Sequence, residues 1–259
     1  MASQPPANLP LFYKNLAPLQ SGPHSAYRMQ PTEKAPFFAN THAVPLTIDE
    51  FVHAQRHFPI VFSAGENSVP LGLFGLNEGV NVYVEADGTL KREVYVPAYV
   101  RRYPYMLARL APDAQELSLC FDPDSGLIGP EGSGELLFEG ERPSEATNAI
   151  LKFCEDFELS AQRTTAFVKE LNDMELLMDG EVAIQSNDQE QPYVYRGFQM
   201  VNEEKFRELR GDELRKINQN GILPLVVAHL FSLGLMRDVF ARQMAEGKVP
   251  PANPALSFA

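Results

Sequence analysis

The order of two hydrophobic patterns along the chain places the tightest limit on its fold. Between residues 59 and 122, short apolar runs are separated by Gly, Pro, Asn and Asp, which is typical of strands joined by hairpins. After residue 144, apolar side chains recur every three or four residues, as on one face of a helix. Strands gathered early and helices gathered late predict an α+β fold, with a β-rich N-terminal half and a helix-rich C-terminal half.

The same patterns predict the domain organisation. Residues 1–45 are rich in proline and polar side chains, and we expect them to form an arm laid over the surface. Residues 46–259 are expected to form a single α+β domain, because neither a repeat nor a long linker interrupts them. Within that domain, residues 59–122 are expected to be β-rich and residues 144–259 mostly helical.

Local signals predict individual elements. Thr47 followed by Glu50 three residues later predicts a capping box at the first helix, and DPDSG at 122–126 predicts a turn made by Asx side chains. Strands are expected at 59–63, 71–76, 81–86, 92–100, 117–122, 181–185 and 193–201. Helices are expected at 144–171, as one long helix or two abutting ones, and at 203–209, 212–219 and 222–245.

Charge and cysteine usage limit the cellular setting. The formal net charge of −12 disfavours general binding to nucleic acid, whose phosphates an acidic protein repels. Cys120 and Cys154 each lie in an apolar run, which predicts buried free thiols in a reducing compartment, and the N-terminus does not resemble a secretory signal. We therefore expect a cytoplasmic protein. The most apolar stretch, residues 222–236, is shorter than the roughly 20 residues of a membrane span, so a core helix and no transmembrane segment are expected.

Few motifs point to catalysis. The sequence contains neither a G-x-S-x-G nucleophile elbow nor a Walker loop. His53 and His57 have the i, i+4 spacing of two metal ligands on one helix face, but Ala54 stands where a zinc protease of the H-E-x-x-H type has its glutamate. With Asp122 and Asp124 they form a candidate metal site, and the alternative is a pair of surface or core-edge histidines.

One basic and aromatic segment stands out from this background. Between residues 91 and 109, five basic residues accompany one acidic residue and four interleaved tyrosines. Arginine and tyrosine in such a mixture can bind an anionic or planar ligand by paired hydrogen bonds and by stacking. The candidate ligand-binding residues are Tyr95, Tyr99, Arg101, Arg102, Tyr103, Asp122, Asp124 and His229.

Each of these candidates has a structural alternative. Residues 110–160 contain twelve acidic and two basic residues, so the basic segment can instead dock on this acidic stretch of the same chain. His229 lies within the most apolar helix, where a histidine hydrogen-bonded inside the core is the alternative to a binding residue.

Several stretches of the sequence resemble the SapC family, which is named for a gene near bacterial surface-layer genes. They are HFPIVF at 57–62, PLGLFGL at 70–76, YVPAYVRRYPY at 95–105, LCFDPDSGL at 119–127, RTTAFVKELNDMELL at 163–177, YRGFQMVNEEKFREL at 195–209 and AHLFSLG at 228–234. The resemblance implies a bacterial protein linked to surface-layer or outer-membrane uptake systems. It assigns no catalytic residue to any position of this chain.

Three hypotheses about function follow. The first is a soluble accessory or binding protein of the SapC type, which holds an anionic or planar ligand or a protein partner through residues 95–105, here called the Tyr/Arg segment. The second is a metal-dependent enzyme whose histidine and aspartate ligands are assembled by the fold. The third is an interaction scaffold whose acidic residues between 113 and 158 engage a basic partner. The sequence identifies no cofactor, and it leaves open whether the protein is an enzyme.

Overall fold

The computed structural model describes residues 9–30, 32–91, 93–111, 116–131, 133–186, 191–249 and the backbone of 256–257. The start of the expected arm, Arg92 of the basic segment, Asp113 of the acidic stretch and residues 187–190 lie outside the described residues. Contacts divide the chain into two compact units, each made of two separate stretches of sequence. Unit 1 contains Met1–Lys34 and Val100–Leu159, and unit 2 contains Ala35–Tyr99 and Ser160–Ala259.

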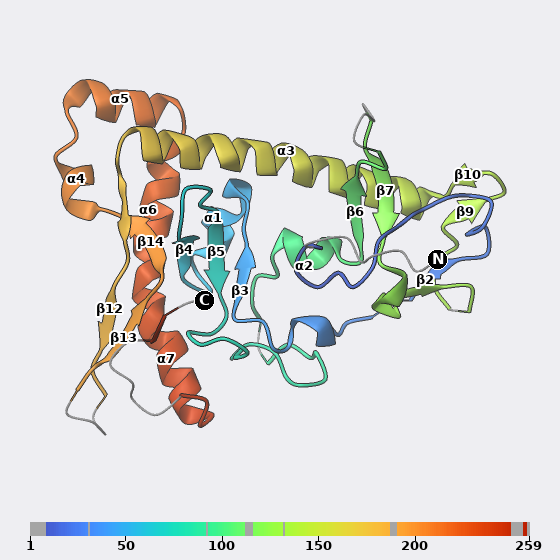
Figure 1. Cartoon of the computed structure of the whole chain (residues 1–259), viewed down its shortest axis with the longest axis horizontal. Helices are drawn as coiled ribbons and strands as arrows, with labels where there is room; N and C mark the ends of the chain where they lie inside the picture. The colour runs from blue at the N-terminus through green and yellow to red at the C-terminus, as the bar shows by residue number, and fades with distance from the viewer. Residues whose placement is uncertain are drawn as a thin grey trace. The chain divides into compact units, whose positions relative to one another are not determined.

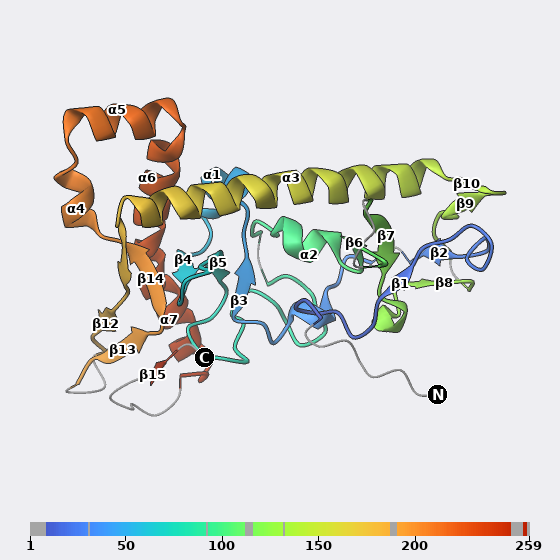
Figure 2. The ribbon, with the colours of Figure 1, turned by 45° about the horizontal axis from the view of Figure 1, so that its top comes forward.

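Unit 1 contains three small antiparallel β-structures, and in two of them an N-terminal strand pairs with a strand about a hundred residues later (Figure 2). A three-stranded sheet has the order β1-β7-β6, β2 pairs with β8, and β9 pairs with β10. The bounds are β1 Ala17–Pro18, β2 Arg28–Met29, β6 Tyr105–Ala108, β7 Ser118–Phe121, β8 Ile128–Gly129, β9 Phe138–Glu139 and β10 Arg142–Pro143. The buried core of this unit consists of Tyr105, Leu107, Phe121, Ile128, Leu137, Phe138 and Cys154.

The described part of the expected surface arm contributes to the interior of both units. In unit 1, the buried Tyr13 donates a 2.6 Å hydrogen bond from its hydroxyl to the backbone carbonyl of Tyr105. In unit 2, Phe38 and Val44 are buried. The arm was expected because the segment is rich in proline and polar residues, and the isolated apolar side chains between them pack into the cores.

Unit 2 centres on a five-stranded antiparallel sheet of order β11-β14-β4-β5-β3. A second sheet has the order β12-β13-β15. The strands are β3 Ala43–Pro45, β4 Ile60–Ser63, β5 Pro70–Leu73, β11 Leu177–Asp179, β12 Val182–Ile184, β13 Tyr193–Arg196, β14 Phe198–Val201 and β15 Leu256–Ser257. Gly72 of β5 lies opposite Ile60, and a Cβ at this position would come within 2.6 Å of the Phe58 ring, so the core needs glycine there.

The helices follow the sequence signals closely. The longest, α3, spans Glu145–Asp173, and the hydroxyl of Ser144 caps it by accepting a 3.2 Å hydrogen bond from the backbone N–H of Thr147. The other helical elements are η1 Pro36–Phe38, η2 Ile48–Glu50, α1 Phe51–Ala54, α2 Ala98–Arg102, η3 Pro123–Ser125, α4 Glu203–Arg207, α5 Gly211–Gln219, α6 Ile222–Ser232, η4 Leu233–Leu235 and α7 Met236–Ala245. The α+β class, with many strands in the first half and helices in the second, is confirmed.

The last helical run, Ile222–Ala245, is long enough and apolar enough to cross a membrane by length and composition alone. It is longer than the apolar stretch recognised in the sequence because α6, η4 and α7 follow one another without a break. Figures 1 and 2 both show α6 beside β14, and Val226, His229 and Val239 of the run are buried in unit 2. The core helix of a folded domain also lies beside a sheet and buries part of its side chains.

Three strand predictions differ from the structure. The run expected as one strand at 193–201 is divided at Gly197 into β13 and β14, which belong to different sheets. Residues 81–86 form no strand and contribute only an isolated bridge between Val84 and Leu90. The run expected as a strand at 92–100 instead enters α2 at Ala98, after Pro97. The β-branched and aromatic residues of this run favour a strand locally, but the cap described below starts a helix there.

Candidate functional site

The Tyr/Arg segment, residues 95–105, begins beside a buried carboxylate of unit 2. Glu50 is 4% exposed, and its Oε1 accepts hydrogen bonds from the backbone N–H of Ala98 at 2.6 Å and from the Tyr95 hydroxyl at 3.2 Å. Its Oε2 accepts from the backbone N–H of Thr47 at 2.8 Å and from the Thr47 hydroxyl at 2.9 Å, which confirms the capping box. Because Ala98 is the first residue of α2, one carboxylate caps the starts of both η2 and α2.

The end of α2 carries two adjacent arginines over aromatic rings of α3, all within unit 1. The exposed Arg101 places its guanidinium 5.2 Å from the centre of the Phe153 ring. The buried Arg102 lies 4.2 Å from the centre of the Phe157 ring. Stacking engages the face of a guanidinium group, whereas its N–H donors lie in the plane and are suited to a carboxylate or phosphate.

Arg102 also contacts the acidic stretch, as the structural alternative predicts. Its Nη1 lies 3.4 Å from Oε1 of Glu158, and both residues belong to unit 1. The basic segment and the acidic stretch therefore meet in this ion pair, in addition to the aromatic contacts.

A hollow of about 280 Å³ lies beside the arginine pair in unit 1. Its walls are mostly apolar and come from β2, α2, β6 and α3. The lining residues are Met29, Arg101, Arg102, Tyr105, Ala149, Ile150, Phe153 and Cys154. This combination of guanidinium groups and apolar walls suits an anion with an apolar body.

Two polar groups in this wall are neutral at ordinary pH. Burial raises the pKa of the Tyr105 hydroxyl, and it raises the pKa of the Cys154 thiol to about 11. Tyr105 is 2% exposed, and its hydroxyl has no hydrogen-bond partner among the residues that the structure describes. A buried hydroxyl without a partner costs about 1–3 kcal/mol, which a ligand acceptor reaching it would offset.

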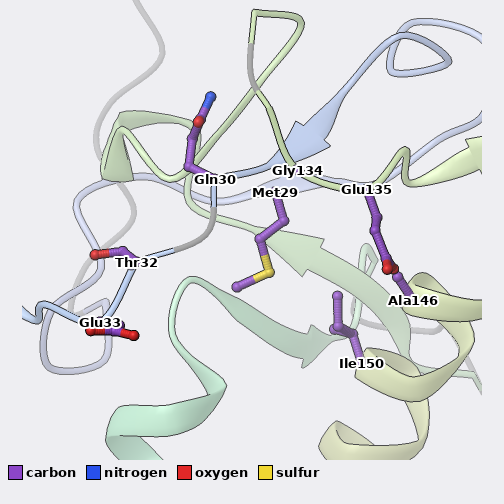
Figure 3. A pocket seen from close by; sticks show the side chains of 8 residues that line it. All are labelled: Met29, Gln30, Thr32, Glu33, Gly134, Glu135, Ala146 and Ile150. Carbon is purple, nitrogen blue, oxygen red and sulfur yellow. The ribbon is translucent and has the colours of Figure 1, made fainter.

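A second hollow of about 670 Å³ adjoins the first, and Figure 3 shows the side chains that line it. Met29 and Ile150 lie in the middle of that view, with Glu33 on one side and Glu135 on the other. The complete lining is Met29, Gln30, Thr32, Glu33, Gly134, Glu135, Ala146 and Ile150. Met29 and Ile150 belong to both hollows.

Asp122 is buried and its oxygens hold three parts of unit 1 together. Its Oδ2 accepts hydrogen bonds from the backbone N–H of Lys14 at 2.8 Å and from the Tyr103 hydroxyl at 3.3 Å. Its Oδ1 accepts from the backbone N–H of Asp124 at 2.9 Å, which confirms the predicted Asx turn. Burial and the nearby Asp122 carboxylate raise the pKa of Tyr103. Asp124 itself is exposed.

His229 bridges two strands in the core of unit 2. Its Nε2 accepts a 3.0 Å hydrogen bond from the backbone N–H of Val201, and its Nδ1 lies 2.8 Å from the carbonyl oxygen of Ile60. The ring is fully buried, and this burial lowers its pKa to about 4. A neutral ring that accepts at Nε2 and donates at Nδ1 satisfies both contacts, so His229 has the geometry of the structural alternative.

The two candidate metal ligands are not aligned by a helix. Helix α1 ends at Ala54, so His57 lies beyond it, and the exposed His53 stacks on the Tyr95 ring at a centroid distance of 5.8 Å. Among the described residues, no group of three or more His, Cys, Asp or Glu side chains could hold a metal ion. The metal site stays a prediction, and the structure adds no further ligand to it.

The remaining candidates divide between the units. Tyr95 and the buried Tyr99 belong to unit 2, whereas Arg101, Arg102 and Tyr103 belong to unit 1. Sequence reasoning missed Met29, Tyr105, Ile150, Phe153 and Cys154 as lining residues of the arginine hollow. Tyr105 belongs to the Tyr/Arg segment, and Phe153 is one of the apolar residues that recur every three or four positions after residue 144. The sequence therefore pointed to both residues, but only the fold shows that they line the same hollow.

The comparisons with known proteins identify a family. No curated protein and no solved structure matches the chain. The family model described as SapC matches residues 19–239, which include both hollows, the arginine pair and most of both units. This match covers far more than half of the sequence and agrees with the resemblance seen in its motifs. The chain therefore belongs to the SapC family.

Proposed function

We propose that this SapC-family protein is a binding protein that holds a small carboxylate with an apolar or planar body in the arginine hollow. The observation that carries the proposal is the pair of adjacent guanidinium groups on α2, each over an aromatic ring, beside a hollow with mostly apolar walls. A carboxylate would bind the arginine N–H donors, and the body of the ligand would contact Ile150 and Phe153.

The size of the hollow limits the ligand. Its volume of about 280 Å³ lies just below the range of about 300–1,000 Å³ that is usual for drug-sized ligands. A molecule with a single ring, such as benzoate, matches this volume. The neutral Tyr105 hydroxyl and Cys154 thiol in the wall do not repel an anion.

Calorimetric titration with benzoate, and with benzamide as its neutral isostere, tests the proposal. We expect benzoate to bind about tenfold more tightly, because a charged carboxylate offers two oxygens to the guanidinium where the amide offers one neutral oxygen, a difference of roughly 1.4 kcal/mol. Arg101→Gln should abolish that preference. Arg142→Gln, which removes an exposed arginine of the same unit that does not line the hollow, should leave it unchanged.

The outcome that contradicts the proposal is equal binding of benzoate and benzamide, or no binding of either. Loss of benzoate binding in both arginine variants would instead indicate a general charge effect. Arg102→Gln is a less informative variant because Arg102 is buried and its loss is expected to destabilise unit 1.

A cytoplasmic location and a link to surface-layer or outer-membrane uptake belong to the same proposal. Family membership and the two buried free thiols support them. Fractionation of cells that express the tagged protein, followed by identification of co-purifying envelope proteins, tests both. Recovery in the periplasm would contradict the location, and absence of envelope partners would contradict the link.

A further inference from the structure

The arginine hollow contains a hydrogen-bond donor that no group of the described structure uses. Tyr105 lines this hollow, and its hydroxyl has no hydrogen-bond partner among the residues that the structure describes. The residue is only 2% exposed, so bulk water does not compensate for the missing bond. Native proteins leave few buried polar groups unpaired, because each one is costly. The hydroxyl therefore marks a position where we expect an acceptor from a ligand.

The rest of the wall offers a ligand little besides apolar contact and the arginines. The apolar lining residues are Met29, Ala149, Ile150 and Phe153. The Cys154 thiol also lines the hollow, but a thiol is a weak donor. Burial raises the pKa of the Tyr105 hydroxyl, so this group stays protonated and able to donate near neutral pH. It is the strongest neutral donor of the wall.

The backbone of Tyr105 is held in place at the start of β6. It lies opposite Phe121 of β7 in the antiparallel pair, and its carbonyl oxygen accepts a 2.6 Å hydrogen bond from the hydroxyl of Tyr13. Neither contact involves the Tyr105 hydroxyl, so the side chain is positioned without using its donor. A donor that is positioned in advance loses little further conformational entropy when a ligand binds.

The volume of the hollow limits how a ligand can carry this acceptor. About 280 Å³ suits a molecule with a single ring, so the acceptor must add little volume to that ring. A nitrogen within the ring meets this condition, because it replaces a C–H group and accepts a hydrogen bond in the plane of the ring. A ring nitrogen that faced an apolar side chain instead would lose its bond to water without replacement. The Tyr105 hydroxyl therefore favours one position of the nitrogen over the others.

We infer that the arginine hollow selects a nitrogen heteroaromatic carboxylate, whose ring nitrogen accepts a hydrogen bond from the Tyr105 hydroxyl while its carboxylate binds Arg101. The inference rests on the proposed function, because Arg101 belongs to the proposed carboxylate site. It adds the class of the ligand, and it makes Tyr105 a residue that determines specificity.

Calorimetric titration of the full chain with benzoate, picolinate, nicotinate and isonicotinate tests the inference. Near neutral pH these acids are anions of nearly the same shape, and they differ in the presence and position of an unprotonated ring nitrogen. We expect one of the nitrogen isomers to bind about three- to tenfold more tightly than benzoate, as for one neutral hydrogen bond to a buried donor. Isomers whose nitrogen faces an apolar side chain should bind more weakly than benzoate.

Tyr105→Phe separates the hydroxyl from the ring that carries it. This variant should bind benzoate within about twofold of the wild type, and it should bind the favoured isomer more weakly than benzoate. Its thermal stability should equal or exceed that of the wild type, because the substitution removes a buried hydroxyl without a partner in the described structure. The control is Tyr27→Phe, which changes a half-buried tyrosine of the same unit that does not line the hollow. It should keep the wild-type order of affinities.

The inference is overturned if no nitrogen isomer binds the wild type more tightly than benzoate, and this comparison needs no variant. A folded Tyr105→Phe variant that retains the preference overturns it too. So does a clear loss of stability in that variant, which would show that the hydroxyl has a structural partner. If benzoate binds through Arg101 and no isomer gains over it, only this inference fails and the proposed function stands. If none of the acids binds, the proposed function fails with it.

Discussion

The carboxylate of Glu50 accepts a 2.6 Å hydrogen bond from the backbone N–H of Ala98, the first residue of α2. The same carboxylate accepts from the backbone of Thr47 through its other oxygen, so two helix starts far apart in the sequence depend on one buried charge. Since α2 ends in Arg101 and Arg102, this cap determines that the two arginines stand on a helix rather than on the strand that their neighbours favour.

Replacing Glu50 by glutamine should destabilise the protein strongly. In glutamine an NH2 group, which is a donor, replaces one acceptor oxygen and faces backbone and side-chain donors, so we expect a loss of about 2–4 kcal/mol in the free energy of unfolding. Tyr95→Phe removes the 3.2 Å bond to Glu50 and should cost about 1 kcal/mol. Urea unfolding of both variants measures the difference, and equal costs would mean that the backbone cap is unimportant.

Asp122→Asn should loosen the N-terminal segment without affecting the ligand. The amide can replace only part of the hydrogen bonds to Lys14, Tyr103 and Asp124, which predicts a loss of about 1–3 kcal/mol. Hydrogen exchange at the Lys14 amide should accelerate, while the affinity for benzoate stays the same. Asp124→Asn changes an exposed carboxylate and should alter stability by less than about 0.5 kcal/mol. Weaker benzoate binding by folded D122N would place Asp122 among the ligand-binding residues after all.

His229 should make stability depend on pH in the acidic range. Burial lowers its pKa to about 4 from the usual 6.5 of histidine, so the unfolded chain binds its proton first as pH falls. This group therefore contributes full stability above about pH 6.5 and progressively less down to about pH 4, roughly 3 kcal/mol in all.

Urea unfolding between pH 4.5 and 7 checks the His229 contribution against His229→Gln, which keeps a donor and an acceptor but does not titrate. The difference in unfolding free energy between the wild type and H229Q should shrink as pH falls from 7 to 4.5. Parallel pH profiles of the two proteins would show that the histidine contributes no pH dependence.

The thiol of Cys154 should be unreactive near neutral pH. Burial raises its pKa to about 11, so only about 0.1% is thiolate at pH 8, and the thiolate is the nucleophile. In a Cys120→Ser variant, the rate of alkylation by iodoacetamide should rise about tenfold per pH unit between pH 8 and 10. Bound benzoate should slow the reaction because Cys154 lines the hollow. A plateau in rate below pH 9.5 would contradict the raised pKa.

Features encoded within a few neighbouring residues could be predicted from the sequence. The box of Thr47 and Glu50, the Asx turn at Asp122 and the long helix that follows Ser144 all rest on contacts within a few residues. Such contacts need no knowledge of the rest of the fold, because the pattern of side chains itself specifies them.

Contacts between distant segments could not be predicted in this way. The pairing of Ala17 with Phe121 joins two-residue and four-residue strands that are about a hundred positions apart, and neither has enough alternation to specify a partner. For the same reason the sequence indicated Arg101 and Arg102 as binding candidates but not the wall that Met29 and Phe153 build beside them. From the sequence, Glu50 was predicted only as part of the cap with Thr47. Its hydrogen bond from Ala98 became visible only in the fold.

The division of the chain into two interleaved units has a consequence for synthesis on the ribosome. The last stretch of unit 1 ends at Leu159, whereas unit 2 begins earlier, at Ala35, and continues to the C-terminus. Unit 1 can therefore fold before the helices after residue 200 have been synthesised. At that stage β3, β4 and β5 of the unit 2 sheet have been synthesised, but β14, which pairs with β4, has not. The exposed edge of β4 during this interval is where a nascent chain of this protein is most open to chaperones and to wrong pairing.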